Sequence, residues 1–413
     1  MQTAGIVAEY NPFHNGHAYQ ISQTKKDTGC DLVVSVMSGN FSQRGVATIV
    51  DKFTRTKMAL LNGIDLVLEL PVPFATSSAE YFAKYAVSVL HQSQIIDCIS
   101  FGSECGEIPL LKHVAETLTT ETETIDLLIR SYLKQGLSFP RARMQSLMDH
   151  LLPQYPASMH TILKNILQSP NNILGIEYLK ALDTLNTTIT PYSVKRIGSN
   201  YHDTTITGSL ASASAIRHSM MLDSSQYKHC MPLSSYELLS GHQPPSMQKL
   251  TAFLHFKLMF SQEEDLYSLW DIPKDLMRTF MKHIQTAPNY ETLVNHSTSK
   301  TYTRATVQRA LLRILLDIHT KDLTPLLTEP HLPYIRVLGC RQNALPLLGK
   351  ISQNAKVPLI TNLGKQYATL SPLGQKLIDY EVRATKLYYY LIGQPEMALQ
   401  DFTQPFIRIH TSS

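Results

Sequence analysis

The chain has 413 residues, of which 43% are hydrophobic and 17% charged, a composition typical of globular proteins. This length exceeds what one ordinary hydrophobic core supports, so at least two domains are expected. No apolar run reaches the roughly 18 residues of a membrane span. Met1 leads almost directly into a strand pattern, so neither a membrane segment nor a secretory signal is expected.

The cysteine pattern indicates a reducing compartment. The five cysteines are scattered and none forms a C-x-x-C pair, which argues against a disulfide framework and a zinc ribbon. A cytoplasmic location is therefore expected. The cysteines are Cys30, Cys98, Cys105, Cys230 and Cys340.

The net charge of +4 is too small to indicate nucleic-acid binding by itself. Its distribution is more informative, because residues 1–200 contain 16 Lys and Arg against 17 Asp and Glu, whereas residues 201–413 contain 21 against 16. This excess permits an RNA partner on the C-terminal side without requiring one.

The first hundred residues alternate between strand and helix patterns. The strand runs are apolar throughout, which is typical of parallel strands covered on both faces. Such alternation indicates right-handed βαβ units and therefore an α/β fold. We expect strands at 4–10, 31–39, 64–71 and 95–104, and helices at 17–29, 51–63 and 78–92.

The rest of the chain is predicted to be mostly helical. A helical insertion at about 106–168 interrupts the sheet, and a late strand at 187–198 returns to it. We place a domain boundary near Asp223, giving a catalytic domain at 1–223 and a mostly helical domain at 224–413. The other expected elements are helices at 169–185, 215–221, 247–260 and 302–319, and one clear C-terminal strand at 332–340.

The stretch "GIVAEYNPFHNGHAYQI" (residues 5–21) places two histidines where a strand gives way to a helix. Unpaired N–H groups and the helix dipole make such a helix start an anion site. Asn11 and Pro12 shape the turn, and Gly16 allows close approach because it has no Cβ. His14 and His17 are then expected to donate hydrogen bonds to phosphate oxygens and to carry positive charge as a pyrophosphate leaves.

Two plainer interpretations of the histidines compete with phosphate binding. They cap the helix, or they bind a metal as a pair. Zinc is disfavoured because no third ligand with suitable spacing is visible nearby. The preceding strand and the following helix favour phosphate binding, because they supply the context that the motif requires.

"PFHNGH" resembles the H-x-G-H motif of the nucleotidyltransferase superfamily, a Rossmann-like group that attacks the α-phosphate of ATP and expels pyrophosphate. The longer phrase resembles one family within it, the bacterial tRNA(Met) cytidine acetate ligases. Further blocks resemble that family in order along the whole chain. They are "MSGNFSQRGVATIVDKFTRTKMAL" (37–60), "FGSE" (101–104), "SPNNILGIEYLKAL" (169–182), "VKRIG" (194–198), "SASAIR" (212–217) and "YIRVLG" (334–339).

The resemblance implies a two-step reaction. Similar proteins convert acetate and ATP to acetyl-adenylate, and then transfer the acetyl group to N4 of the wobble cytidine, position 34, of elongator tRNA(Met). They need no acetyl-CoA. Acetate is already ionised at pH 7, so the first step needs orientation and charge neutralisation more than a base, with Mg²⁺ held mainly by the phosphates.

The resemblance also implies site residues. His14, His17 and Arg196 are the expected catalytic residues. Asn171 is a helix cap or a nucleotide contact, and Arg196 is a phosphate ligand or a solvated residue at a strand end. The expected ATP-binding residues are Val7, Ala8, Glu9, Tyr10, Asn11, Pro12, Phe13, His14, Asn15, Gly16, His17, Ala18, Tyr19, Gln20, Gly102, Asn171 and Arg196.

Other basic residues are weaker candidates. Ser214 and Arg217 stand at a helix start and are expected near the β- and γ-phosphates. Lys52 and Arg55 either neutralise charge in the transition state or lie exposed in the first turns of a helix. Arg309 and Arg313, four residues apart on the expected surface of the helix at 302–319, are candidates for RNA backbone contacts.

Two other functions remain open at this point. An adenylyltransferase for a small substrate predicts a compact domain of about 160–200 residues, so the large C-terminal region argues against it. A non-catalytic RNA-binding scaffold predicts a degenerate nucleotide site, whereas "HNGH", "VKRIG" and "SASAIR" are intact.

Overall fold

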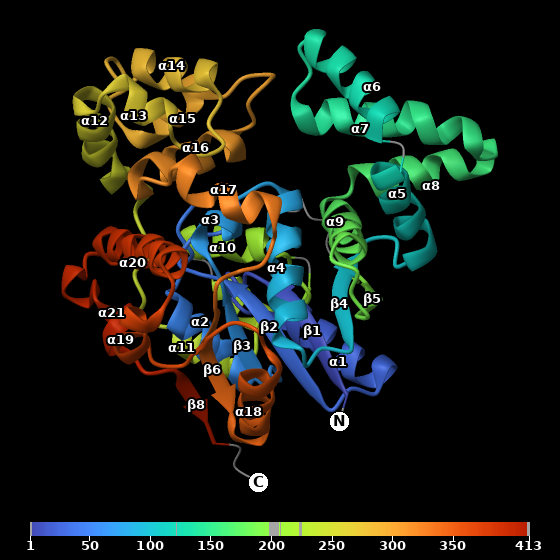
Figure 1. Cartoon of the computed structure of the whole chain (residues 1–413), viewed down its shortest axis with the longest axis vertical. Helices are drawn as coiled ribbons and strands as arrows, with labels where there is room; N and C mark the ends of the chain where they lie inside the picture. The colour runs from blue at the N-terminus through green and yellow to red at the C-terminus, as the bar shows by residue number, and fades with distance from the viewer. Residues whose placement is uncertain (1, 121, 198–205, 207, 223–224, 411–413) are drawn as a thin grey trace.

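The computed structural model describes residues 2–120, 122–197, 206, 208–222 and 225–410. One sheet of eight strands, in the order β5-β4-β1-β2-β3-β6-β7 with β8 paired to β6, forms the centre of the described chain (Figure 1). The strands are β1 (Thr3–Ala8), β2 (Leu32–Ser38), β3 (Leu66–Leu70), β4 (Cys98–Ser103), β5 (Thr190–Lys195), β6 (Ile335–Arg341), β7 (Leu359–Ile360) and β8 (Ile407–Ile409).

The α/β fold expected from the N-terminal sequence is confirmed. Strands β5, β4, β1, β2 and β3 pair in parallel. Their carboxyl ends therefore meet at one edge of the sheet, which is where ligands bind in open α/β folds. The turns after β1, β2, β4 and β5 all lie at this edge.

The strand predicted at 332–340 joins the same sheet. It forms β6, which pairs antiparallel with β3. The sheet therefore continues across the predicted domain boundary, and the mostly helical region at 224–413 does not stand apart from it. Residue 223 itself lies outside the described residues.

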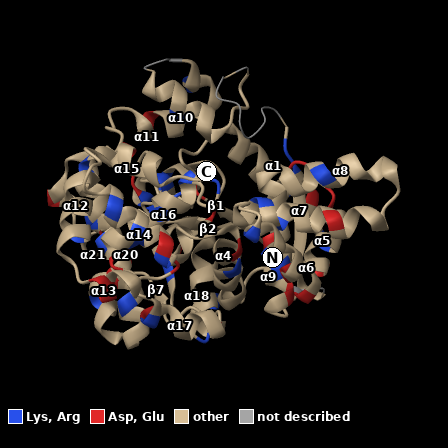
Figure 2. Ribbon diagram, turned by 90° about the horizontal axis from the view of Figure 1, so that it is seen from above, with Lys and Arg blue, Asp and Glu red and all other residues tan. Residues whose placement is uncertain are grey.

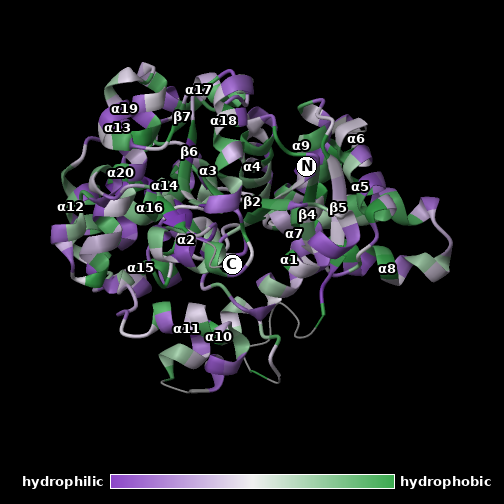
Figure 3. Cartoon of the chain, turned by 90° about the horizontal axis from the view of Figure 1, so that it is seen from below, coloured by the Kyte–Doolittle hydropathy of each residue, from purple (hydrophilic) through white to green (hydrophobic). Residues whose placement is uncertain are grey.

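Helices cover both faces of the sheet. Alternate residues of β2 belong to different cores, with Val34 and Val36 on one face and Val33 and Met37 on the other. Figure 3 shows the central strands largely in green, as expected for strands buried on both faces. Helices α4 and α9 pack together on one face, and α1 and α2 lie on the opposite face. Their bounds are α1 (Asn15–Thr28), α2 (Lys52–Leu61), α4 (Ala79–Ser93) and α9 (Pro170–Thr184).

Two helical groups flank the sheet (Figure 1). Helices α5–α8 occupy the segment predicted as a helical insertion, and they project to one side. The C-terminal group containing α12–α16 lies on the other side. No helix in the described part of the chain combines the length and apolar character needed to cross a bilayer.

The helices of the two flanking regions and of the C-terminal part complete the fold. They are α3 (Val72–Ala75), α5 (Ile108–Thr120), α6 (Thr122–Lys134), α7 (Phe139–Leu151), α8 (Ala157–Gln168), α10 (Ala213–Met221), α11 (Leu233–Leu239), α12 (Leu250–Phe260), α13 (Glu263–Tyr267), α14 (Lys274–His283), α15 (Tyr290–Ser297), α16 (Arg304–Leu316), α17 (Thr320–Thr328), α18 (Leu345–Asn354), α19 (Leu363–Gln366), α20 (Pro372–Ile392) and α21 (Gln400–Thr403).

Candidate active site

The turn after β1 places both histidines of the H-x-G-H motif at the start of α1. Nδ1 of His14 accepts a hydrogen bond from the backbone N–H of Gly16 (3.0 Å), and the backbone N–H of His14 donates to Nδ1 of His17 (3.2 Å). A Cβ atom at Gly16 would lie 2.8 Å from Cε1 of His14, so only glycine leaves room for the folded-back ring. The spacing of the motif is therefore explained by reciprocal capping of the helix start.

The cap determines which nitrogens remain for a ligand. Because Nδ1 of each ring accepts a hydrogen bond, the neutral imidazole carries its proton on Nε2. The rings of His14 and His17 stack with centroids 3.8 Å apart, and both residues line the cavity. The helix-cap interpretation and the phosphate interpretation are thus compatible, since they use different nitrogens.

Burial keeps both imidazoles neutral. Burial, followed by the charges of Arg196 and Arg217, lowers the pKa of His14 to about 3. Burial, followed by His14 and Arg196, holds the pKa of His17 well below its ordinary value. In the free protein the histidines are therefore neutral donors and the arginines supply the charge, while positive charge on the histidines as pyrophosphate leaves stays a prediction.

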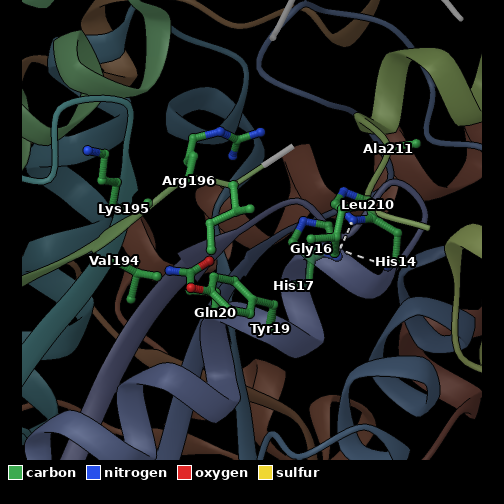
Figure 4. Close-up of a pocket in the computed structure, with 12 residues that line it drawn as sticks. His14, Gly16, His17, Tyr19, Gln20, Val194, Lys195, Arg196, Leu210 and Ala211 are labelled. Carbon is green, nitrogen blue, oxygen red and sulfur yellow. Dashed lines mark hydrogen bonds between the residues drawn. The ribbon is translucent and has the colours of Figure 1, made fainter. Parts of the chain in front are cut away.

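Arg196 extends from the end of β5 toward the histidines. Its backbone N–H donates to the carbonyl of Ser103 at the end of β4 (2.9 Å). A Cβ atom at Gly102 would touch the Arg196 side chain at 3.5 Å, so the guanidinium stem lies along the glycine. Figure 4 shows the β5 end, with Arg196, facing Gly16 and His17 of α1 across a recess.

The start of α10 supplies the second cationic group. Ser212 caps this helix by accepting a hydrogen bond from the backbone N–H of Ala215 (3.0 Å), as the sequence predicts. Arg217 donates to the carbonyl of Asn11 (2.7 Å) and to Oγ of Ser214 (3.2 Å). The helix start and Arg217 are thereby tied to the histidine turn, an arrangement that favours bound anions.

These groups line one cavity of about 710 Å³ at the carboxyl edge of the parallel strands. The nucleotide residues predicted outside the histidine turn, Gly102, Asn171, Arg196, Ser214 and Arg217, all lie in its wall. Within the predicted stretch from Val7 to Gln20, ten residues line this cavity or the adjoining recess. They are Val7, Ala8, Glu9, Tyr10, Asn11, His14, Gly16, His17, Tyr19 and Gln20.

Four residues of the predicted ATP-binding stretch do not line the cavity. Phe13 is fully buried, and Ala18 packs against the core beneath α1. The side chain of Asn15 donates to the carbonyls of Ser209 (3.0 Å) and His229 (2.9 Å). These residues, together with Pro12, hold the turn and the helix in place.

Asn171 has a structural contact as well as a place in the cavity wall. Its Nδ2 donates to Oε1 of Glu104 (2.6 Å), and the Glu104 carboxylate also accepts from the backbone N–H of Asn172 (2.9 Å). Glu104 therefore caps the start of α9. Asn172, which the sequence analysis missed, is buried and its Oδ1 accepts from Oγ of Ser103 (2.7 Å).

Lys52 does not reach the cavity. It is fully buried beside β3, with Nζ 2.6 Å from Oε1 of Glu69 and 2.7 Å from Oδ1 of Asp401. Burial lowers the pKa of Lys52, but Asp401 and Glu69 more than offset this effect and raise it above its ordinary value. Both the charge-neutralising interpretation and the exposed interpretation of Lys52 are wrong.

Arg55 is also fully buried, and its side chain binds backbone carbonyl groups. Its guanidinium donates to the carbonyls of Glu9 (2.6 Å), Ser38 (3.1 Å) and Gly39, which end β1 and β2. Arg55 therefore positions the turns that form the cavity and does not face it, which contradicts both interpretations made from the sequence.

The predicted RNA-binding pair also lies elsewhere than expected. Arg313 is buried, with Nη2 donating to the carbonyl of Thr76 (3.2 Å) and its guanidinium 4.7 Å from the ring of Trp270. Arg309 is partly buried under the turn that contains Gly45. A Cβ atom added to Gly45 would lie 2.6 Å from the backbone nitrogen of Arg309. The predicted surface position of Arg313 is wrong.

The far end of the cavity was missed from the sequence. It is formed by the loop after β2 and by the first turn of α16, which lie more than 250 residues apart in the chain. No local pattern indicates this contact, because neither the block at 37–60 nor the helix predicted at 302–319 specifies its distant partner. The residues are Ser42, Gln43, Arg44, Val46, Thr303, Arg304, Ala305 and Gln308.

Comparison with known proteins agrees with this geometry. The family model described as HIGH Nucleotidyl Transferase matches residues 1–403. The tRNA(Met) cytidine acetate ligase of Acetivibrio thermocellus is 37% identical over 98% of this chain and 100% of its own. That of Caldicellulosiruptor saccharolyticus is 39% identical over 94% of both chains. The chain belongs to the tRNA(Met) cytidine acetate ligase family.

Solved structures show the same architecture for this ligase family. The crystal structure of apo Thermotoga maritima TmcAL covers 100% of both chains with a TM-score of 0.92 and 29% identity. The same Thermotoga protein bound with alpha-thio ATP matches with a TM-score of 0.90. A crystal structure of a protein with this fold therefore contains a bound ATP analogue.

Proposed function

We propose that this protein activates acetate with ATP, forming acetyl-adenylate and diphosphate, and transfers the acetyl group to N4 of the wobble cytidine 34 of elongator tRNA(Met). The product is N4-acetylcytidine, and acetyl-CoA takes no part. The names of the relatives support the substrates, and the site supports the chemistry.

One observation carries the proposal. Two neutral imidazole donors, two guanidinium groups and the start of α10 converge on one wall of the cavity. Such a wall suits a triphosphate and the pyrophosphate that leaves it, since fixed N–H groups and cations stabilise negative charge without reorganising. In the proposal His14, His17 and Arg196 act on the reacting phosphate, and Ser214 and Arg217 hold the β- and γ-phosphates.

The first step needs no protein base. Acetate is ionised at neutral pH, so its carboxylate attacks the α-phosphate directly once the charges are neutralised and the two reactants are held together. The site residues therefore bind, orient and screen charge. The neutral state of the histidines fits this role, because a donor without charge does not pair with the incoming acetate.

In this proposal Mg²⁺ binds to the phosphates of ATP. The described residues include no group of three or more His, Cys, Asp or Glu side chains arranged for a metal ion. Mg²⁺ commonly binds through substrate phosphates and water, so this donor set fits a nucleotide-borne ion. Bound Mg²⁺ would screen the phosphate charge, and no protein side chain is assigned to it.

The tRNA is expected to approach over the open end of the cavity. Arg44 and Arg304 line this end and are exposed, and they replace Arg313 as candidates for backbone contacts. Figure 2 shows Lys and Arg interspersed with Asp and Glu on both helical flanks. The wobble base must leave the anticodon stack to reach the acyl group. A cytoplasmic location follows from this substrate and from the reduced cysteines.

One assay tests the proposed function. The protein is incubated with labelled acetate, ATP and elongator tRNA(Met), and the digested tRNA is examined for acetylcytidine. Omitting ATP, or replacing acetate and ATP with acetyl-CoA, provides the controls. Acetylcytidine that depends on acetate and ATP is expected. Pyrophosphate release without acetylated tRNA would show that the acceptor is wrong, and nucleotide binding without turnover would favour a scaffold.

A further inference from the structure

Glu9 lines the cavity, and its side chain binds the loop after β2. It directly follows β1, and Oε1 accepts a hydrogen bond from the backbone N–H of Gln43 in the loop after β2 (2.7 Å). Strand β2 lies on one side of β1 in the sheet, whereas β4 and β5 lie on the other. The Glu9 carboxylate is therefore tied to the loop after β2, while Tyr178 of α9 is close enough to feel its charge.

The Glu9 carboxylate makes no salt bridge within the described part of the chain, although the charge of Arg55 attracts it. The guanidinium of Arg55 binds the backbone carbonyl of Glu9 at 2.6 Å and not its carboxylate. Oε1 accepts from Gln43, whereas Oε2 makes no hydrogen bond within the described part of the chain, and Glu9 lines the cavity. A partly buried carboxylate in this position requires a hydrogen-bond donor.

The charge of Glu9 argues against a phosphate as its partner. A carboxylate repels a triphosphate, so Glu9 suits an uncharged donor group, either the adenine amine or a ribose hydroxyl of ATP or an amine of the second substrate. An acetyl-adenylate bound at the histidine end also lacks such groups at its reactive carbon. The exocyclic amine of cytosine is the kind of donor that a Glu carboxylate accepts from in base recognition.

The walls beside Glu9 fit a flat base. Phe82 of α4, Phe101 of β4 and Tyr178 of α9 are buried and line the cavity. The rings of Phe101 and Tyr178 lie 5.6 Å apart at 48°. Aromatic surfaces of this kind stack on unpaired bases irrespective of their sequence context, so the carboxylate would supply the selectivity.

We propose that Glu9 binds the exocyclic amine of the acceptor cytosine and takes its proton during acyl transfer. This assignment rests on the proposed function. The N4 nitrogen attacks the acetyl carbonyl carbon, an N–C bond forms, and the C–O bond to AMP breaks. AMP leaves with the electron pair of that bond, and the N4 proton passes to the Glu9 carboxylate. Glu9 is then a catalytic residue of the second step and not a ligand of ATP.

The two half-reactions of Glu9→Gln test the assignment. The amide oxygen still accepts from the backbone of Gln43, so the loop is expected to stay in place. Acetate-dependent exchange of pyrophosphate into ATP should remain within about twofold of wild type. Single-turnover transfer from preformed acetyl-adenylate to elongator tRNA(Met) should fall by about 10²–10⁴-fold, the range for losing a general base.

Three comparisons make the result decisive. Glu9→Asp should recover part of the transfer rate, and Glu107→Gln, an exposed carboxylate outside the cavity, should match wild type in both steps. Equal loss of exchange and transfer in Glu9→Gln would place Glu9 on the nucleotide or its Mg²⁺ and overturn the assignment, as would undiminished transfer. Absence of exchange in the wild-type protein would instead refute the proposed function.

Discussion

The basic side chains of the cavity and those buried beside β3 differ in what neutralises them. Beside β3, Lys52 and Arg336 share Glu69 and Asp401, with every N–O distance between 2.6 and 2.8 Å. In the cavity Arg196 has no carboxylate partner among the described residues, and Arg217 donates to a carbonyl and a hydroxyl.

This contrast shows why residue type alone does not identify an anion site. The buried cluster pairs two cations with two carboxylates, and the pKa of Asp401 is lowered to about 2 because Lys52 and Arg336 outweigh the effect of burial. Its charge is already balanced. The charge of Arg196 is balanced only when an anion is bound, so this arginine is available to a triphosphate.

The largest expected effect is on folding. Lys52→Met leaves Glu69 and Asp401 buried with Arg336 as their sole cation, which should lower the free energy of unfolding by about 3–5 kcal/mol. Chemical denaturation measures this change. Lys57→Met, at an exposed position of the same helix, should stay within about 0.5 kcal/mol of wild type. Equal stability of the two variants would contradict the contrast between the clusters.

Arg196→Ala should show the opposite pattern. Its guanidinium is exposed at the cavity, so folding stability should change little, while acetate-dependent exchange of pyrophosphate should fall by about 10²-fold. Arg196→Lys should recover only part of the rate, because a point charge replaces a planar fork of donors. A wild-type exchange rate in Arg196→Ala would remove this arginine from the reaction.

Gly16→Ala should weaken nucleotide binding by about tenfold, a change of about 1.4 kcal/mol. The new Cβ atom would meet Cε1 of His14 at 2.8 Å and push the ring out of its capping position. Calorimetric titration with a non-hydrolysable ATP analogue measures the affinity. Gly349→Ala, where no heavy atom lies within 4 Å of the added carbon, is the matched control. Unchanged affinity in Gly16→Ala would show that the ring position is unimportant.

The smallest effect concerns acid stability. The pKa of His14 is lowered to about 3 in the folded protein, against about 6.5 in an unfolded chain, so the folded state binds fewer protons between these values. The contribution of His14 to stability is complete above pH 6.5 and is lost as the pH falls toward 3. Between pH 6.5 and 5.5, His14→Asn should lose about 1 kcal/mol less than wild type in denaturant unfolding. Parallel losses would contradict a neutral, buried His14.

Much of the fold follows from local patterns in the sequence. Apolar runs ending in turn residues marked β1 to β5, and helical spacing marked α1, α2, α4 and α9, because each pattern reflects burial within one element. The antiparallel pairing of β6 with β3 was not predictable. Its partner lies more than 260 residues away, and a nine-residue apolar run does not specify its neighbour.

The candidate site was likewise predictable only where its residues are contiguous in the sequence. The histidine end was predicted because a strand, a turn and a helix start are contiguous in sequence. Lys52, Arg55 and Arg313 were misplaced, because a basic residue near a helix start or on a helix face is exposed by default, and their buried partners come from distant segments. Glu9 was assigned to ATP because it lies within the conspicuous motif, but its contact with Gln43 in the loop after β2 could not be predicted from that motif.

The most direct test of the central claim is acetate-dependent exchange of pyrophosphate into ATP by His14→Asn. Asparagine is a good helix cap and can still accept from Gly16, but it removes the imidazole Nε2–H donor from the cavity. We predict an unchanged melting temperature and an exchange rate lowered by about 10²-fold or more. An exchange rate equal to that of wild type would contradict the claim that the histidine turn binds the triphosphate.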